Sequence, residues 1–595
     1  MTETLLSIKD LRVTFDHGKS VAVDGLSFDV RPGECVAVVG ESGSGKSVTA
    51  MSILGLTAFN GGRTETGQIA FTRRNGRIVD LATAPEASLR TIRGDEIAMI
   101  FQEPMTSLNP VFTVGEQIAE VIRNHKQVGA AEAGRAALAL IERVRIPEPE
   151  RRYGQYPHEL SGGMRQRVVI AMALACAPRL LIADEPTTAL DVTIQAQILH
   201  LVRSLSRESG MAVLFITHDM GVVAEMADRV VVMRHGRKVE EADVRTLFAA
   251  PREDYTQVLL ASVPRLGSMR GFAEPRKFGF DNAAQATPPR PTQPLLEVRN
   301  LVTRFPVRKG LLQRHVANVH AVDDVSFSIG SGETLALVGE SGCGKSTTGR
   351  SILRLVKATS GSVTLEGQDI LGLSADALRQ RRRDMQIIFQ DPYAALDPRL
   401  TAIEQVAEPL VIHGVDHGSA LTDRVVALFR RVGLSEDQLD RYPHEFSGGQ
   451  RQRLCIARAL TLSPKLIVAD EPVSALDVSI QAQVVNLLIE LQEELGLSYL
   501  FISHDMAVVE RMSHRVAVMH MGRIVEIGPR GAVFDAPGHA YTRTLLAAVP
   551  KPDPTVPRRA APDPGLLPSP IHPVGHLPAP ASYDEVGPGH FVLAA

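Results

Sequence analysis

The sequence predicts an α/β fold with largely parallel sheets, present in two tandem copies. Short apolar runs at residues 35–39, 180–183 and 213–216 have the length of buried strands, and they alternate with helical segments, as in sheets covered by helices. The sequence GESGSGKS at residues 40–47 returns as GESGCGKS at residues 339–346, which indicates a duplication. A chain of 595 residues is also too long for one hydrophobic core.

A second repeated motif shows that the two copies carry different insertions. YPHELSGGMRQR, which includes Ser161, returns as YPHEFSGGQRQR, which includes Ser447. Lys345 follows Lys46 by 299 residues, whereas Ser447 follows Ser161 by only 286. The extra residues lie around 60–87 in the first half and in the 308–320 region of the second. Both stretches are rich in Gly or charge, which is typical of surface loops.

Composition sets the expected domain boundaries. Residues 272–294 combine repeated Pro with Thr, Gln, Asn and Ala, which is typical of a semi-extended linker. Residues 551–595 are still richer in Pro, so we expect a tail without a core of its own. The predicted organisation is a first domain at 1–265, a Pro-rich linker at 266–294, a second domain at 295–550 and a Pro-rich C-terminal tail at 551–595.

The composition argues against several classes of protein. Lys and Arg number 64 against 67 Asp and Glu, without the basic excess that neutralises nucleic-acid phosphates. The N-terminus lacks the basic and long apolar stretches of a secretory signal, so we expect a cytoplasmic protein. The most apolar stretch, 168–183, contains Pro178 and Arg179 and is shorter than the roughly 20 residues that cross a bilayer. Four cysteines without CxxC spacing favour reduced thiols.

The repeated GxxxxGK[ST] segments have the pattern of a phosphate-binding loop. Their glycines let backbone N–H groups surround phosphates, and the following helix adds its positive N-terminus. Lys46 or Lys345 would reach the β- and γ-phosphates of ATP, and Ser47 or Ser346 would coordinate Mg²⁺. A Gly-rich turn without a ligand is the alternative, disfavoured because the loop occurs twice between a strand and a helix. The expected nucleotide-binding residues are Gly40, Glu41, Ser42, Gly43, Ser44, Gly45, Lys46, Ser47 and Val48, and Gly339, Glu340, Ser341, Gly342, Cys343, Gly344, Lys345, Ser346 and Thr347.

An Asp-Glu pair follows an apolar strand in each half. Asp184 and Asp470 end these strands, where a carboxylate can reach the water shell of the metal, although a helix cap or turn would also use Asp there. The next residues, Glu185 and Glu471, are better placed to polarise the attacking water. We expect them to act as general base or to position that water.

Two further kinds of position have a functional and a structural interpretation. His218 and His504 follow apolar strands in FITHD and FISHD, where a lone histidine is more often structural. Their fixed place after the Asp-Glu pair favours contact with the γ-phosphate.

Cys343 stands in the phosphate loop where the first half has serine. The interpretation we favour is that this position tolerates different residues. The alternative is a thiol with a lowered pKa whose alkylation would block the loop.

LSGGMRQR and FSGGQRQR, each between a phosphate loop and an Asp-Glu pair, resemble the signature motif of the ABC ATPase superfamily. The resemblance covers both halves except the linker and the tail. It implies two tandem ABC-type P-loop ATPase domains, each with a mostly parallel sheet core, an antiparallel β subdomain and a helical signature subdomain. It also implies that the halves pair within the chain, head to tail on two ATP molecules, so that Lys46 serves with Ser447 and Lys345 with Ser161. The signature residues are Ser161, Gly162 and Gly163, and Ser447, Gly448 and Gly449.

The same resemblance implies roles at other matching positions. Gln102 and Gln390 would sense the metal and the water and couple to membrane subunits. Asp191 and Asp477 would lie in the loop between the sites. The implied metal ligands are Ser47, Gln102, Asp184, Ser346, Gln390 and Asp470. Because both halves keep every one of these motifs, we expect two active sites.

Phe15 and Phe305 match the aromatic residue that stacks on adenine in the family. Two core aromatics on a first strand are the alternative interpretation. Phe305 lies 40 residues before Lys345, whereas Phe15 lies 31 residues before Lys46. This longer interval weakens the match of Phe305.

Segments around the two glutamines narrow the resemblance to the oligopeptide/dipeptide importer group. Residues 101–120 and 389–410 are similar to its two ATPase subunits, and residues 254–264 and 539–550 resemble the segment that closes its ATPase domain. The implied partners are two integral-membrane permease subunits and an extracytoplasmic solute-binding protein, with the chain peripheral at the cytoplasmic face of the inner membrane. Di- or oligopeptides are the first expectation for the solute; glutathione, nickel chelates, opines and oligosaccharides remain open. No cysteine follows Cys455, so no iron–sulfur cluster is expected.

A soluble ABC ATPase resembling translation factors is the main alternative. Those proteins have a long charged helical linker and lack the permease-coupling segments, whereas this linker is rich in Pro and those segments are present. DNA-repair relatives insert zinc-binding cysteines, and drug exporters usually carry fused membrane helices. The sequence shows neither feature.

Overall fold

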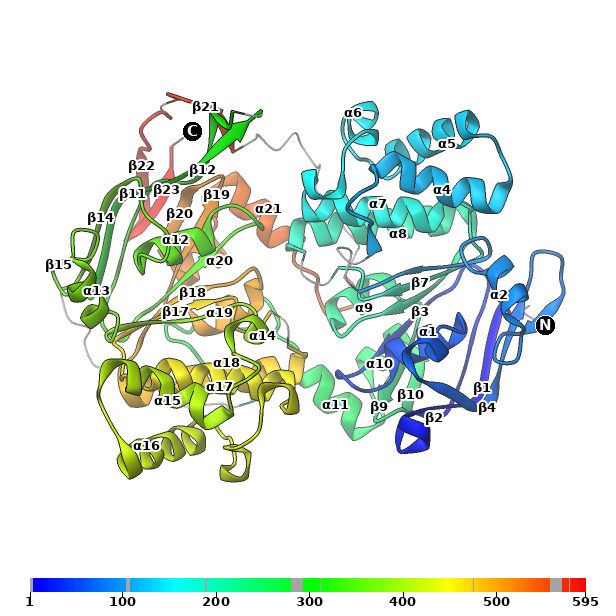
Figure 1. Ribbon diagram of the computed structural model, residues 1–595, viewed down its shortest axis with the longest axis horizontal. Coiled ribbons are helices and arrows are strands. Elements are labelled where there is room, and N and C mark those ends of the chain that lie inside the picture. Colours follow the sequence, from blue (N-terminus) through cyan, green and yellow to red (C-terminus); the bar gives the residue numbers. More distant parts are fainter. Residues whose placement is uncertain are drawn as a thin grey trace. The chain divides into compact units, whose positions relative to one another are not determined.

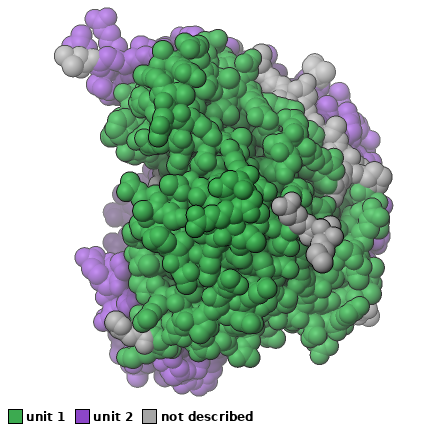
Figure 2. Space-filling view, turned by 90° about the vertical axis from the view of Figure 1, so that its right-hand side faces the viewer, with its two compact units in different colours: residues 1–190, 194–263, 550–562 green, residues 191–193, 264–549, 563–595 purple. Residues whose placement is uncertain are grey.

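The computed structural model forms two compact units (Figure 2). It describes residues 4–102, 107–187, 190–279, 293–310, 312–474, 476–556, 570–576 and 578–594. Unit 1 comprises residues 1–190, 194–263 and 550–562, and unit 2 comprises residues 191–193, 264–549 and 563–595. No helix within these described residues is long and apolar enough to cross a membrane.

The main sheet of unit 1 has the strand order β10-β9-β3-β8-β7-β6. All its pairings are parallel except that of β10 with β9. Strands β3, β7 and β8 are buried at every residue, which explains why the sequence shows them as unbroken apolar runs. The strands are β3 (Cys35–Val39), β6 (Ile97–Ile100), β7 (Leu180–Asp184), β8 (Ala212–Ile216), β9 (Arg229–Arg234) and β10 (Arg237–Asp243).

A second, antiparallel sheet of unit 1 has the order β2-β1-β4-β5. Its apolar face and one face of the main sheet share a core that includes Leu6, Phe71, Val36 and Ile182, and α1 packs in the same core through Ile53. The strands are β1 (Leu6–Phe15), β2 (Ser20–Val30), β4 (Arg63–Thr72) and β5 (Ile78–Asp80).

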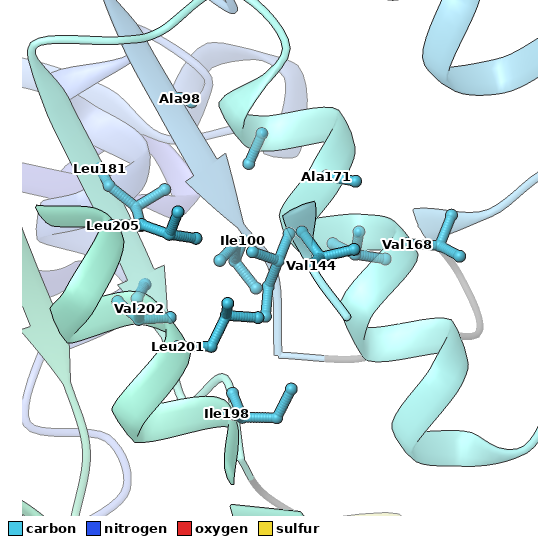
Figure 3. Packing of buried hydrophobic residues seen from close by; sticks show 14 of the residues in the cluster. Ala98, Ile100, Val144, Val168, Ala171, Leu181, Ile198, Leu201, Val202 and Leu205 are labelled. Atoms are coloured by element: carbon cyan, nitrogen blue, oxygen red, sulfur yellow. The ribbon is translucent and has the colours of Figure 1, made fainter. Parts of the chain in front are cut away.

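The opposite face of the main sheet is covered by helices. Figure 3 shows Ile100 and Leu181 of the sheet against Val168 of α7 and Leu201 of α8, one continuous hydrophobic core. The helices of this unit are α1 (Lys46–Ile53), α2 (Glu86–Ile92), α4 (Val114–Lys126), α5 (Ala130–Arg143), α6 (Pro149–Tyr153), α7 (Gly162–Leu174), α8 (Val192–Ser209), α9 (Met220–Met226), α10 (Val244–Ala249) and α11 (Asp254–Ala261). Helices α4 to α7 pack on one another and form the predicted helical subdomain.

Unit 2 repeats this plan with longer sheets. Its main sheet has the order β16-β17-β18-β13-β19-β20-β23-β22, and its antiparallel sheet the order β15-β14-β11-β12-β21. The strands are β11 (Leu296–Lys309), β12 (Arg314–Ile329), β13 (Thr334–Val338), β14 (Ser360–Leu365), β15 (Gln368–Asp369), β16 (Met385–Ile388), β17 (Leu466–Asp470), β18 (Ser498–Ile502), β19 (Arg515–His520), β20 (Arg523–Pro529), β21 (Ile571–Pro573), β22 (Tyr583–Gly587) and β23 (His590–Leu593). The predicted fold class, two tandem α/β domains with parallel and antiparallel sheets, is confirmed.

The helices of unit 2 follow the order of unit 1. They are α12 (Lys345–Ile352), α13 (Ala375–Arg381), α14 (Pro392–Ala395), α15 (Ala402–His413), α16 (Gly418–Arg431), α17 (Gly448–Leu460), α18 (Val478–Leu495), α19 (Met506–Met512), α20 (Arg530–Asp535) and α21 (Ala540–Ala548). The contacts of α17 with α14, α15 and α16 build the helical subdomain.

The two Pro-rich stretches contribute to unit 2 through residues 266–279 and the described residues from 570 on, whereas residues 551–556 belong to unit 1. In the stretch after α11, the Gly267 N–H donates to Glu510 (2.7 Å) and the Phe278 N–H to Asn486 (2.7 Å). Residues 280–292 of the expected linker lie outside the described residues. From the C-terminal stretch, β21 joins the antiparallel sheet, and β22 and β23 join the main sheet beside β20 (Figure 1). These strands find their partners in the sheets of unit 2.

Candidate functional site

Each phosphate-loop sequence forms a tight loop between a strand and a helix. In unit 1 the loop connects the end of β3 to Lys46, the first residue of α1. Gly40 and Gly45 have positive φ angles of 153° and 93°, and a Cβ at either would collide with a backbone carbonyl, that of Met233 or Ala22. A Cβ at either matching glycine of unit 2 would collide with the equivalent backbone carbonyl. The loop therefore requires glycine at these positions, as the phosphate-binding interpretation demands.

The lysine of each loop is folded back over the loop's own carbonyl groups. Lys46 is buried, and its Nζ donates to the carbonyl oxygens of Gly40 (2.7 Å) and Glu41 (2.8 Å). Lys345 makes the equivalent bonds in unit 2, both at 2.8 Å. An ammonium group is thus fixed beside loop N–H groups, an arrangement that suits the β- and γ-phosphates of a nucleotide.

The residues next to each lysine fit a magnesium ion. Ser47 Oγ donates to Asp184 Oδ1 at 3.1 Å, and Ser346 Oγ donates to Asp470 Oδ1 at 2.6 Å. Burial raises the pKa of Asp184 to about 6 and also raises the pKa of Asp470. Hydroxyl and carboxylate oxygens are the ligands that Mg²⁺ prefers, and a divalent cation would favour the ionised form of both carboxyl groups. The chemistry of this donor set therefore suits the ion.

In unit 1, a glutamate, a histidine and a glutamine converge from three different strand ends. His218 Nδ1 lies 3.1 Å from Glu185 Oε1, and the Gln102 side-chain amide donates to Glu185 Oε2 at 3.0 Å. These residues follow β7, β8 and β6, which are parallel neighbours in the sheet. The carboxyl ends of parallel strands meet at one edge, where ligands of such sheets bind.

Unit 2 repeats the cluster with nearly the same distances. His504 Nδ1 lies 3.0 Å from Glu471 Oε2, and the Gln390 amide donates to the same oxygen at 2.9 Å. Burial opposes ionisation of Glu471, but the contacts with His504, Lys345 and Gln390 hold its pKa below the usual value. The pKa of His504 is raised, because the contact with Glu471 outweighs burial. Glu471 is therefore a carboxylate at neutral pH.

Both glutamates have an unusual backbone conformation that the sequence does not reveal. Their φ angles are 46° at Glu185 and 49° at Glu471, in the left-handed region that costs free energy for residues other than glycine. The Glu185 N–H donates to the Ile216 carbonyl, and the Glu471 N–H to the Ile502 carbonyl, both at 2.9 Å. Pairing with the neighbouring strand holds this conformation and directs each carboxylate toward the histidine.

The signature serines begin helices α7 and α17. Ser161 accepts the Met164 N–H at 3.4 Å, and Ser447 is the N-cap of its helix in the same way. A Cβ at Gly163 would collide with Ile194 of α8, so this glycine is needed for packing. In contrast, apart from its chain neighbours and the backbone of its own helix, no described atom lies within 4 Å of a Cβ at Gly162. Internal packing therefore does not require glycine at position 162.

The remaining predicted positions differ in exposure. Phe15 is half-buried, and its ring lies against Gly62, where a Cβ would collide with it. Phe305 is 40% exposed. Asp191 is buried just before α8, and Asp477 is the N-cap of α18.

A tyrosine behind each phosphate loop was missed in the sequence. The Glu41 N–H donates to the Tyr255 hydroxyl at 3.3 Å, and the Glu340 N–H donates to the Tyr541 hydroxyl at 3.1 Å. These tyrosines lie on α11 and α21, the segments that close each domain. Their repetition in DYTQ and AYTR was the available signal. The closing segments therefore support the loops directly.

The hypothesis of a reactive Cys343 is wrong. The side chain is only 5% exposed and belongs to the hydrophobic core of unit 2. Burial raises the pKa of the thiol despite the nearby Lys345. The cysteine therefore packs as a small apolar residue, as the favoured interpretation had it.

Comparison with known proteins matches the whole chain. A family model described as ABC transporter matches residues 23–188 and 322–474, and one described as oligopeptide/dipeptide transporter, C-terminal region, matches residues 239–279 and 525–574. The chain is 57% identical over 602 residues to the glutathione import ATP-binding protein GsiA of Pectobacterium atrosepticum, covering 99% of this chain and 96% of that protein. It is 55% identical over 603 residues to the protein of the same description from Escherichia coli, with the same coverage.

Proposed function

Since this chain belongs to the ABC transporter family, as an ATP-binding importer subunit with the oligopeptide/dipeptide type of C-terminal region, we propose that it powers the uptake of glutathione or a closely related small peptide. The observation that carries the proposal is identity above half over 99% of the chain with relatives described as glutathione import ATP-binding proteins. Two complete sets of catalytic side chains support hydrolysis in both halves.

In each half the proposed hydrolysis rests on a small set of polar groups. Glu471 orients the attacking water and accepts its proton, because its lowered pKa keeps it ionised. His504 holds that carboxylate in place and faces the γ-phosphate. Lys345 neutralises charge on the phosphates. The equivalent residues of unit 1 have the same roles, and bound Mg²⁺ would supply further neutralisation of the transferred phosphoryl group.

Each site is proposed to use the signature motif of the other half. The Lys46 loop would act with Ser447, and the Lys345 loop with Ser161. The open space beside Gly162 supports this assignment, because the N-terminus of a helix such as α7 favours an anion and no described side chain fills the space at this glycine. Roles for Asp191 and Asp477 in the loop between the sites belong to the same proposal.

The segments after the two glutamines are proposed to bind the permease subunits. In unit 1 this segment exposes Val111 and Phe112, which are 70% and 49% exposed. In unit 2 it exposes Tyr393 and forms an open groove lined by Leu396 and Arg399 among others. Exposed apolar side chains beside polar groups are typical of a protein interface. Two integral-membrane permeases and an extracytoplasmic binding protein would place the chain at the cytoplasmic face of the inner membrane.

Reconstitution with these partners tests the proposal. ATP hydrolysis by the complex in liposomes should be slow and should rise when the binding protein carries glutathione. A dipeptide and a nickel chelate serve as the comparison solutes. Hydrolysis at the full rate without any solute, or stimulation by the nickel chelate alone, would contradict the proposed function.

A further inference from the structure

The aromatic residue proposed to contact adenine is supported differently in the two halves. In unit 1, Phe15 is the last residue of β1, and a single short turn at Asp16–Gly18 leads directly into β2. In unit 2, Phe305 lies inside the hairpin of β11 and β12, which continues beyond it to the pair Lys309 and Arg314. The nine additional residues between the aromatic and the phosphate-loop lysine lie in this longer hairpin.

The C-terminal strand β21 pairs with the outer edge of this hairpin. Phe305 is opposite Val319, and Val319 is opposite Ile571. The next two sets of residues aligned across β11, β12 and β21 are Pro306, Asn318 and His572, followed by Val307, Ala317 and Pro573. Every residue of β21 therefore lies in line with Phe305 or one of the two residues after it.

Further contacts attach the same C-terminal segment to unit 2. The His320 N–H donates to the Pro570 carbonyl at 2.9 Å, and its buried ring lies 4.7 Å from the ring of His572. His572 in turn stacks on His576 at 4.3 Å. Arg523 donates to the Ala579 carbonyl at 2.7 Å. We call the described residues from 570 to 593 the strap.

The strap also reaches the main sheet. Strand β23 pairs with β20, and the Tyr583 hydroxyl donates to the Ile524 carbonyl at 2.8 Å. His590 Nε2 lies 2.7 Å from Glu526, which accepts the N–H groups of Gly538 and His539 before α21. The strap therefore connects the edge of the antiparallel sheet with the edge of the main sheet (Figure 1).

Strand β14 pairs with β11 only as far as Val302, so β21 is the third strand where the hairpin extends beyond that residue. An isolated two-stranded hairpin is marginally stable in water, whereas three paired strands hold their backbone. Phe305 is 40% exposed, so side-chain packing alone does not fix its ring. We propose that the strap is a positioning element that fixes Phe305 against the adenine of the nucleotide held by the Lys345 loop. This inference rests on the proposed ATPase function and deepens it for the second site, because the short turn after Phe15 makes a strap unnecessary in the first.

Breaking β21 at one backbone position tests the inference. The pairing of His320 with Pro570 places His572 at a hydrogen-bonded position of the ladder, so His572→Pro removes a ladder donor. The matched control is Val574→Pro. Val574 occupies the second position of a turn in which the His576 N–H donates to Pro573 and Gly575 has a φ of 89°, and proline is favoured there.

Binding of MgATP and of magnesium tripolyphosphate is measured by calorimetry in the full chain carrying Lys46→Ala and Glu471→Gln, so that only the second site binds and nothing is hydrolysed. Phe305→Ala should weaken MgATP binding by about 5- to 150-fold, the range of base–aromatic stacking. His572→Pro should weaken it by about 2- to 13-fold, the cost of ordering one side chain on binding. Tripolyphosphate, which has no base, should bind equally to all variants, as should MgATP to Val574→Pro.

The double variant separates positioning from general damage. In the Phe305→Ala background, His572→Pro should cause no further loss, because the group it positions is gone. An unchanged affinity of Phe305→Ala would contradict the proposed base contact itself. Suppose instead that Phe305→Ala weakens MgATP binding as expected. If His572→Pro then has no effect, or causes the same loss of affinity with and without Phe305, only the proposed role of the strap is wrong. If thermal unfolding shows that His572→Pro is poorly folded, Ile571→Gly with His572→Gly weakens the strand while keeping its N–H groups and is judged by the same criteria.

Discussion

The two halves share the groups that would act on water but differ around the aromatic residue proposed to contact adenine. The glutamate–histidine distance is 3.1 Å in unit 1 and 3.0 Å in unit 2, and the glutamine–glutamate distance is 3.0 Å and 2.9 Å. In contrast, Phe15 ends a strand at a short turn, whereas Phe305 lies in a longer hairpin paired with β21. Hydrolysis depends on a few interatomic distances, so the catalytic side chains are arranged almost identically in the two halves. The aromatic residue proposed to contact adenine can instead be held by quite different local structures.

Replacing both glutamates tests the equivalence of the catalytic clusters. Glu185→Gln with Glu471→Gln keeps the size of each side chain and removes its ability to accept a proton. We expect nucleotide binding to remain and hydrolysis by the reconstituted complex to fall by roughly 10²–10⁴-fold, the usual contribution of general-base catalysis. Each single variant should lower turnover to a similar degree. Near-normal hydrolysis in the double variant would remove both residues from the mechanism.

A pair of double variants tests how the sites are divided between halves. In a Glu471→Gln background that traps nucleotide, Lys46→Ala with Ser447→Arg should damage one composite site and leave about one occluded ATP per chain. Lys46→Ala with Ser161→Arg should damage both sites and abolish occlusion. The measurement is bound radiolabelled ATP after gel filtration.

The reverse result has an equally clear meaning. If Lys46→Ala with Ser161→Arg retained one occluded ATP while Lys46→Ala with Ser447→Arg retained none, each site would be built within its own half. The head-to-tail assignment would then be wrong, although the two catalytic clusters would still be equivalent.

Acid should weaken the pairing of the strap with β12, the feature that distinguishes the second half from the first. Burial lowers the pKa of His320 from 6.5, Arg304 and the neighbouring His572 and His576 lower it further, and Asp323 opposes them. Because the folded state favours neutral His320, its stabilising contribution is complete above pH 6.5 and is lost as the pH falls below that value. Hydrogen exchange at the His572 amide, corrected for the intrinsic rate, should show up to about tenfold more opening one pH unit below 6.5.

The first half supplies the control for this effect. Val21 precedes Ala22 as His320 precedes Ala321, and both alanine carbonyls face the last glycine of a phosphate loop. His320→Val should therefore fold and should remove most of the pH dependence. The same acid response in this variant would exclude His320 as its origin.

Local motifs predicted the residues of the site better than the residues that hold the site in place. The loop residues around Lys46 and Lys345 were identified because phosphate binding needs glycines, a lysine and a hydroxyl within eight consecutive residues. Tyr255 and Tyr541 were missed, because their bonds to the loops join residues 214 and 201 positions apart. Cys343 was assigned two possible states, and only its burial decided between them.

The sequence by itself determined that this protein has two α/β copies, which residues form the phosphate loops and which carboxylates and histidines follow the strands, whereas Gln102 and Gln390 were implied only by the family resemblance. Those features are local, because strand periodicity and phosphate chemistry both act over a few residues. Only the tertiary structure decided the positive φ of Glu185 and Glu471 and the pairing of residues 571–573 with β12. A Pro-rich segment has too few apolar residues to build a core, but it can still complete a sheet whose edge offers unpaired backbone groups, and that edge exists only after the rest of unit 2 has folded.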